Sequence, residues 1–111
     1  MGVTRDPAHG FVLTLAAGGT MTEILADATS LMVPATDGAI KQALTRLKMY
    51  PLITGFRGKP AADVAAICAA VQAIQAYVIE NADTVCEVEV NPLICTPTRA
   101  VAADALIRKA R

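Results

Sequence analysis

The alternation of apolar and polar positions along the chain predicts four short strands. Residues 11–16 and 30–33 are apolar, partly β-branched runs of strand length. Residues 85–90 alternate valine with cysteine and glutamate, a pattern typical of a half-buried strand. We expect the last strand at residues 100–107, where apolar residues follow a proline-containing turn.

Three other segments have helical spacing. A short helix is expected at residues 21–26, with Thr20 as its cap. A second helix begins at Thr36, and its apolar positions recur at helical spacing until Pro51 stops it. The longest helix is expected at residues 61–81, where alanine, valine and isoleucine form an apolar stripe.

The order of these elements predicts the fold class. Residues 52–60 hold two glycines and are expected to form an extended piece followed by a turn. The remaining elements give an α+β fold with helices packed on a mostly antiparallel sheet. A chain of 111 residues is long enough for one core, so we expect a single domain over residues 1–111.

Composition narrows the classes of function. The chain is 54% hydrophobic and 18% charged, which is typical of a packed globular protein. Its formal net charge of zero gives no electrostatic reason to expect nucleic acid or a membrane as a partner. No secretory signal is visible, and the three cysteines, all in apolar surroundings, favour reduced core thiols in a cytoplasmic protein.

Candidate metal chemistry lies near the end of the chain. Glu87, Glu89 and Asn91 share one strand face, because successive side chains of a strand alternate. If the chain folds back through its next turn, Asn91 lies opposite Asp104. Oxygen ligands of this kind suit magnesium, which binds few protein groups and completes its shell with water and phosphates. The alternative is a solvated polar face. Asp104 shifts the balance, since a carboxylate within an apolar strand needs a partner or an ion.

The chain resembles the ATP-grasp domain of the ADP-forming (NDP-forming) acyl-CoA synthetases, in the succinyl-CoA synthetase superfamily. The matching motifs follow one another through nearly the whole sequence, and together they are more specific than any one alone. In chain order they are GVTRDP at residues 2–7 with Gly10, Gly18 and Gly19 with Glu23 and Asp27, YPL at residues 50–52 with GFRG at residues 55–58 and Asp63, EVEVNPL at residues 87–93, and ADA at residues 103–105.

The resemblance implies a fold and an activity. It implies the second, C-terminal lobe of an ATP-grasp fold. Enzymes of this family interconvert acyl-CoA, ADP and phosphate with a carboxylic acid, CoA and ATP, and acetyl-CoA synthetase (ADP-forming) is one such ligase. A phosphohistidine carries the phosphoryl group between sites, and magnesium bridges the phosphates of the nucleotide. The implied cofactors are therefore magnesium and ATP or ADP.

The resemblance also implies roles for particular residues. Asn91 and Asp104 correspond to magnesium ligands, and Glu89 to a catalytic residue near the phosphoryl group. Arg57 corresponds to a residue that contacts phosphate, a role that suits a guanidinium between glycines; a surface arginine capping a turn is the alternative.

Three further positions are candidates for cofactor binding. Asp6 lies beside the active site in the resemblance, although Asp-Pro is also an ordinary turn pair. Gly18 and Gly19 form either a simple strand-to-helix turn or a place where backbone amides meet an anion.

The implied partners are the other parts of such an enzyme. The nucleotide of an ATP-grasp fold lies between two lobes, and we expect this chain to need the N-terminal lobe and the CoA-binding domains for activity. Leu31 stands where the family has an arginine. A second hypothesis is therefore a non-catalytic remnant that acts as an interaction or regulatory module. An unrelated small α+β regulatory domain is a third, although it would leave the ordered motif matches to chance. An exposed strand edge, with pairing to the other lobe or a homodimer, is expected if the lobe is separated from its sheet.

Overall fold

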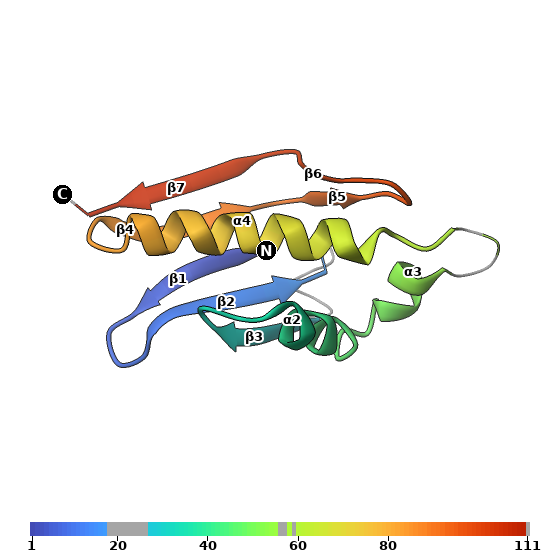
Figure 1. Cartoon of the computed structure of the whole chain (residues 1–111), viewed down its shortest axis with the longest axis horizontal. Coiled ribbons are helices and arrows are strands. Elements are labelled where there is room, and N and C mark those ends of the chain that lie inside the picture. The colour runs from blue at the N-terminus through green and yellow to red at the C-terminus, as the bar shows by residue number, and fades with distance from the viewer. Residues whose placement is uncertain (18–26, 56–57, 59, 111) are drawn as a thin grey trace.

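A five-stranded antiparallel sheet forms the framework of the chain in the computed structural model, which describes residues 1–17, 27–55, 58 and 60–110 (Figure 1). Every neighbouring pair in this sheet is antiparallel, and β1 lies at its centre. The α+β class predicted from the sequence is confirmed. In spatial order the strands are β3 (Ala28–Met32), β2 (Gly10–Ala16), β1 (Gly2–Asp6), β4 (Val85–Val90) and β7 (Ala105–Lys109).

The central strand β1 was not expected from the sequence. Its five residues include only one buried apolar side chain, that of Val3. Strand β1 forms because it pairs on both sides, with β2 and with β4, and this pairing satisfies its backbone hydrogen-bonding groups. Its composition alone does not predict a strand. Gly10 has a φ of 88° where the turn enters β2, a conformation that glycine adopts without strain.

Helix α2 (Asp37–Leu44) begins where the sequence predicts and ends earlier. The side chain of Thr36 accepts a hydrogen bond from the amide of Ala39 at 3.1 Å and so caps the helix. Pro51 does not stop this helix. It lies in the first turn of a separate short helix, α3 (Tyr50–Thr54), a position that proline favours because its nitrogen needs no hydrogen-bond partner there. The extended piece expected from residue 52 is therefore wrong over residues 52–54.

The long helix α4 (Val64–Glu80) starts three residues later than predicted. The side chain of Asp63 accepts a hydrogen bond from the amide of Ala66 at 2.9 Å and so forms the N-cap. The backbone amide of Asp63 also donates to the carbonyl oxygen of Thr96 at 2.8 Å. A backbone hydrogen bond therefore links the start of α4 to the loop that contains Thr96.

The core lies between one face of the sheet and the helices. Val3, Leu13 and Val88 point from the three middle strands toward it, and α2 and α4 bring Ile40 and Val71. Figure 1 shows α4 running along the sheet. On the opposite face, the strand side chains that alternate with the core residues are exposed or half-buried. Among the described residues, no helix covers this face, which we call the open face.

The C-terminal segment forms two strands instead of the single strand expected at residues 100–107. Strand β6 (Ala100–Ala102) pairs with β5 (Leu93–Cys95), which was not expected, and β7 joins the main sheet at its edge. Asp104 falls in the break between β6 and β7 and is exposed, so it does not lie within an apolar strand as the sequence suggested.

Two smaller predictions can be compared with the structure. Cys68 is buried, but Cys86 is half-buried and Cys95 is exposed, so the expectation of three core thiols holds only for Cys68. None of the helices in the described part of the chain has both the length and the apolar character that crossing a bilayer requires.

Candidate functional site: the open face of the sheet

The register of the strands arranges the open face in rows. One row places Gly2 between Thr14 on β2 and Glu89 on β4, and Ser30 on β3 extends it beyond Thr14. Directly paired residues lie on the same face of a sheet. Because Val3 points into the core, Gly2 and its row face the opposite, open side.

At one edge of this face, Glu89, Asn91 and Asp104 line one hollow with a volume of about 350 Å³. The amide of Asn91 donates to the carbonyl oxygen of Asp104 at 3.1 Å, just past the point where β4 pairs with β7. The predicted opposition of Asn91 and Asp104 is therefore confirmed. Ala105 and Leu106 complete the wall of the hollow.

The carboxylates in and near this hollow have different partners, and the amino terminus of Met1 interacts electrostatically with Glu89. Glu87, one row away, forms an ion pair with Arg108 and so carries its own counter-charge. Both Glu89 and Asp104 are exposed, and one oxygen of the Asp104 carboxylate accepts the amide of Ala105 at 2.9 Å. Two carboxylates and an amide oxygen are thus available to an entering cation.

This set of donors fits magnesium. All its ligands are hard oxygens, and their small number leaves room for the water and phosphate oxygens that magnesium retains. The described part of the chain has no group of three or more histidine, cysteine, aspartate or glutamate side chains suited to a metal. A metal ion in this hollow would therefore need the side-chain oxygen of Asn91 in addition to the two carboxylates.

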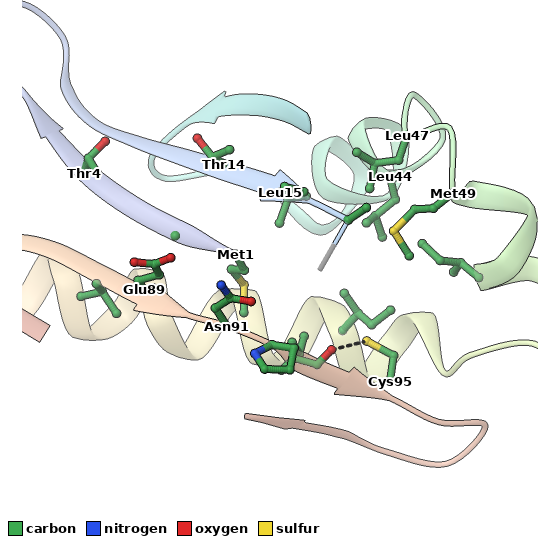
Figure 2. A pocket seen from close by; sticks show the side chains of 18 of the residues that line it. Met1, Thr4, Thr14, Leu15, Leu44, Leu47, Met49, Glu89, Asn91 and Cys95 are labelled. Atoms are coloured by element: carbon green, nitrogen blue, oxygen red, sulfur yellow. Dashed lines mark hydrogen bonds between the residues drawn. The ribbon is translucent and has the colours of Figure 1, made fainter. Parts of the chain in front are cut away.

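A larger cavity of about 690 Å³ adjoins the hollow and shares Glu89 and Asn91 with it. In Figure 2, Thr4, Thr14 and Glu89 lie toward the polar end of this cavity, on three different strands. The opposite end is apolar. It is lined by Leu44, Leu47, Met49, Ile53, Ile67, Leu93 and Cys95, which come from α2, the segment after it, α3, α4 and β5.

Of the other predicted site residues, the structure describes only Asp6, which does not join this group. Asp6 lies in the turn at the far end of β1, where its carboxylate accepts the amide of Ala8 at 2.8 Å, and it lines neither cavity. A role for Asp6 in cofactor binding stays a prediction. Arg57, Gly18 and Gly19 lie outside the described residues.

Two other residues of the matching motifs have structural partners. The guanidinium of Arg5 donates to the carbonyl oxygens of Ala82 and of Val85, the latter at 2.7 Å, and lies 4.9 Å above the centre of the Phe11 ring. Arg5 thereby holds the turn between α4 and β4 against the sheet. The place of Arg5 in a matching motif is therefore explained by this structural role, without contact with a ligand.

Asp27 is the second such residue, and it is buried. Its carboxylate oxygens accept the backbone amides of Lys48 at 2.6 Å and Met49 at 2.9 Å. Sequence reasoning missed Gly2, Thr14 and Ser30 as neighbours of the site. The GVTRDP motif was a signal for Gly2, but without β1 in the predicted sheet its position beside Glu89 could not be found.

Comparison with known proteins agrees with this architecture. Residues 1–108 match the ATP-grasp domain family. The β subunit of acetate–CoA ligase (ADP-forming) II from Pyrococcus furiosus is 33% identical over 93 residues, which cover 84% of this chain and 39% of that protein. A trans-feruloyl-CoA synthase from an unknown prokaryotic organism is 37% identical over 110 residues, covering 96% of this chain and 15% of that protein.

Solved structures give the same result. The acetyl-coenzyme A synthetase 1 of Candidatus Korarchaeum cryptofilum, in complex with coenzyme A and acetyl-coenzyme A, superposes with a TM-score of 0.90 at 29% identity, covering 98% of this chain and 48% of that one. A protein of Pyrococcus horikoshii has the same TM-score at 31% identity. The chain thus spans less than half the length of each of these four relatives. It belongs to the ATP-grasp domain family, and its relatives include an ADP-forming acetate–CoA ligase and an acetyl-coenzyme A synthetase.

Proposed function

We propose that this chain supplies the magnesium- and phosphate-binding lobe of an ADP-forming acyl-CoA synthetase. The reaction converts acyl-CoA, ADP and phosphate to a carboxylic acid, CoA and ATP. The observation that carries the proposal is the meeting of Glu89, Asn91 and Asp104 in one hollow beside an open sheet face. A relative whose structure contains Mg-AMPPCP has a TM-score of 0.87 with this chain and supports the choice of ligand.

Each residue of the hollow has a distinct part in the proposal. Magnesium, when bound, neutralises negative charge on the phosphate oxygens and so lowers the barrier to phosphoryl transfer. Asn91 and Asp104 hold the ion through their side-chain oxygens. Glu89 lies between the hollow and the larger cavity, where it orients the group that exchanges the phosphoryl with the nucleotide. In a Korarchaeum structure a phosphohistidine segment points towards the nucleotide-binding site, which fits this assignment.

The proposal also assigns partners. The complementary lobe of the ATP-grasp domain covers the open face and encloses ATP or ADP, and CoA-binding domains of the same enzyme supply the acyl group. Arg57, which lies outside the residues that the structure describes, is proposed to contact phosphate. Catalysis of this kind depends on positioning and charge neutralisation, so the geometry of the ligands matters more than any nucleophile.

Manganese, a paramagnetic substitute for magnesium, tests the metal site directly. When Mn²⁺ and ADP are titrated into isotope-labelled protein, the amide signals near Glu89, Asn91 and Asp104 should broaden first. The titration is run on the chain alone and mixed with a separately made complementary lobe. Asp104→Asn should weaken metal binding by about tenfold or more, since even an outer partner of a metal ligand is worth 10–100-fold.

The matched control is Asp83→Asn, which removes an exposed carboxylate at the turn between α4 and β4. This variant should bind manganese like the unmodified chain. Asparagine at position 104 can still accept the amide of Ala105, so loss of metal without loss of fold is the expected pattern. Broadening of signals from residues elsewhere in the chain would contradict the proposed site. Equal losses of manganese affinity in the two variants would contradict it as well.

A second candidate function has one observation in its favour. All five residues of β7 are exposed, and Leu106 and Ile107 are large apolar side chains among them. A strand with this character favours an interaction module, whose role is to bind another protein. Under this alternative the manganese titration gives no site at Glu89, Asn91 and Asp104.

A further inference from the structure

Asp27 is a buried carboxylate that the proposed function does not use. Its two side-chain oxygens accept the backbone amides of Lys48 at 2.6 Å and Met49 at 2.9 Å. Neither ion pair found among the described residues involves Asp27. Burying a carboxylate is costly unless hydrogen bonds replace the lost water. An acidic residue at this position therefore needs a reason that a neutral side chain would not supply.

The number of acceptor atoms supplies that reason. Lys48 and Met49 are consecutive in the sequence, and each amide donates to a different oxygen of the same carboxylate. Asparagine has the same shape but only one acceptor oxygen, so its NH2 group would face the second amide. Aspartate therefore fixes the backbone of this segment more completely than asparagine can.

The segment that Asp27 fixes forms one wall of the larger cavity. Leu47 and Met49, which flank Lys48, both line this cavity. In Figure 2, Leu47 and Met49 lie on one side of the cavity and Asn91 lies on the other. Asp27 itself lines neither the cavity nor the metal hollow. Its carboxylate therefore holds the wall of Leu47 and Met49 from behind.

Asp27 also joins this wall to the sheet. Its backbone carbonyl oxygen accepts the amide of Ala17 at 3.0 Å, just past the end of β2. Ala16 and Ala17 line the larger cavity as well. One residue thus connects two parts of the cavity lining that are distant in the sequence. Through the sheet, this connection fixes the position of Met49 relative to Asn91, which follows β4.

We infer that Asp27 is a positioning residue for ligand binding. It holds the wall of Leu47 and Met49 in the arrangement that receives the apolar part of the nucleotide, and it contacts no phosphate. A wall that is already ordered does not have to be ordered when the ligand enters. The effect of Asp27 is therefore confined to ligands that reach this wall. The inference rests on the proposed function and adds to it a residue outside the cavity.

Two probes separate the wall from the metal site. Mg–ADP carries a base and a phosphate chain, whereas Mg–pyrophosphate carries the phosphates alone. Asp27→Asn should weaken Mg–ADP binding by about tenfold, which corresponds to a wall that is correctly ordered about a tenth of the time. The affinity for Mg–pyrophosphate should not change. Calorimetry in the presence of the complementary lobe measures both affinities.

Two further variants make the result specific. Thr36→Ala removes the cap of α2, and it should leave both affinities unchanged although it also removes a hydrogen bond that holds the fold. Met49→Ala truncates the wall and should weaken Mg–ADP binding alone, which tests the wall even if Asp27→Asn does not fold. In the double variant, Asp27→Asn should weaken Mg–ADP binding less than it does by itself, because both changes act through one wall.

The outcomes separate this inference from the proposed function. If neither probe binds the unmodified chain with its complementary lobe, the proposed function fails and the inference fails with it. If both probes bind and Asp27→Asn weakens them equally, Asp27 only stabilises the fold, and the inference alone is overturned. Unchanged Mg–ADP affinity in Asp27→Asn or in Met49→Ala would overturn it as well.

Discussion

Asp27 shows how much one buried carboxylate can hold together. It is 4% exposed and accepts the backbone amides of both Lys48 and Met49, which lie in the segment between α2 and α3. A carboxylate that accepts two backbone amides makes charge-assisted hydrogen bonds, which are stronger than neutral ones. Leu47 and Met49 of the same segment line the apolar end of the larger cavity, so Asp27 positions that end although it does not line the cavity itself.

Asp27→Ala should lower the free energy of unfolding by about 2–3 kcal/mol, because it leaves two partly buried amides without their acceptor. Denaturant unfolding measures this change. Asp83→Ala, which removes an exposed carboxylate, should change stability by no more than about 0.5 kcal/mol. Equal effects of the two substitutions would show that Asp27 does not hold the segment.

Asp6 gives a prediction about pH. The amide of Ala8 and the ring of His9 both hydrogen-bond the Asp6 carboxylate and lower its pKa below the ordinary value of 3.8. A folded-state pKa below the unfolded value means that the stabilisation is present above the unfolded pKa. It is lost as the pH falls through the folded pKa.

Carbon NMR of the Asp6 carboxyl should give a pKa below 3.8. His9→Gln should raise that pKa only part of the way, because the amide of Ala8, the larger cause, remains. The stability difference between the unmodified chain and Asp6→Asn should shrink as the pH falls below the folded pKa. A carboxyl that titrates at or above 3.8 would contradict the hydrogen bonds of this turn.

At the scale of elements, the N-cap of α4 decides where the longest helix begins. Asp63→Ala should lower the free energy of unfolding by about 1 kcal/mol, the usual cost of losing a cap. Asp63→Ser should restore most of the loss, because serine is also a good cap. Thermal unfolding of the three proteins checks this prediction, and no rescue by serine would mean that the carboxylate acts elsewhere.

The elements that could be predicted are those whose pattern is local. Strand β4 has the bounds predicted from its alternating valines, and Thr36 marks the start of α2. Strand β1 was missed because it is stabilised by pairing with β2 and β4. Strand β4 is distant in sequence, so a short window of residues around β1 does not reveal this pairing. Pro51 was misread because proline either ends one helix or opens the next, and only the packing of α3 decides between them.

The same distinction divides the candidate site. Asn91 and Asp104 could be placed together because they lie at the facing ends of β4 and β7, which one short segment of the chain joins. Gly2, Thr14 and Ser30 lie on three strands, and their meeting depends on the order of the whole sheet. The pairing of Asn91 with Asp104 was therefore accessible from sequence, whereas the row of Gly2, Thr14 and Ser30 required the fold.

At the scale of the whole molecule, the sheet ends in an uncovered strand. Strand β7 is the edge next to β4, and within the described residues no strand pairs with its outer side. Leu106 faces the open side with Glu89, whereas Ile107 faces the helix side with Val88. An edge with apolar side chains on both faces is a template for pairing with another strand.

We expect the chain on its own to self-associate through β7, since no other lobe competes for the edge. Sedimentation equilibrium should then give an average mass above 11.5 kDa that rises with concentration. Ile107→Lys should return the mass to that of the monomer, because a charge on an edge strand opposes pairing. The matched control is Ile79→Lys on α4, where the isoleucine is 53% exposed compared with 47% for Ile107.

The control distinguishes strand pairing through β7 from nonspecific hydrophobic association. If both lysine variants become monomeric, exposed apolar area alone drives association, and β7 has no special role. If only Ile107→Lys does, the edge of the sheet is the contact, and adding the complementary lobe should show whether two partners compete for it. A chain that stays at 11.5 kDa at every concentration would contradict the prediction, and would mean that the twist of β7 already prevents a second strand from pairing.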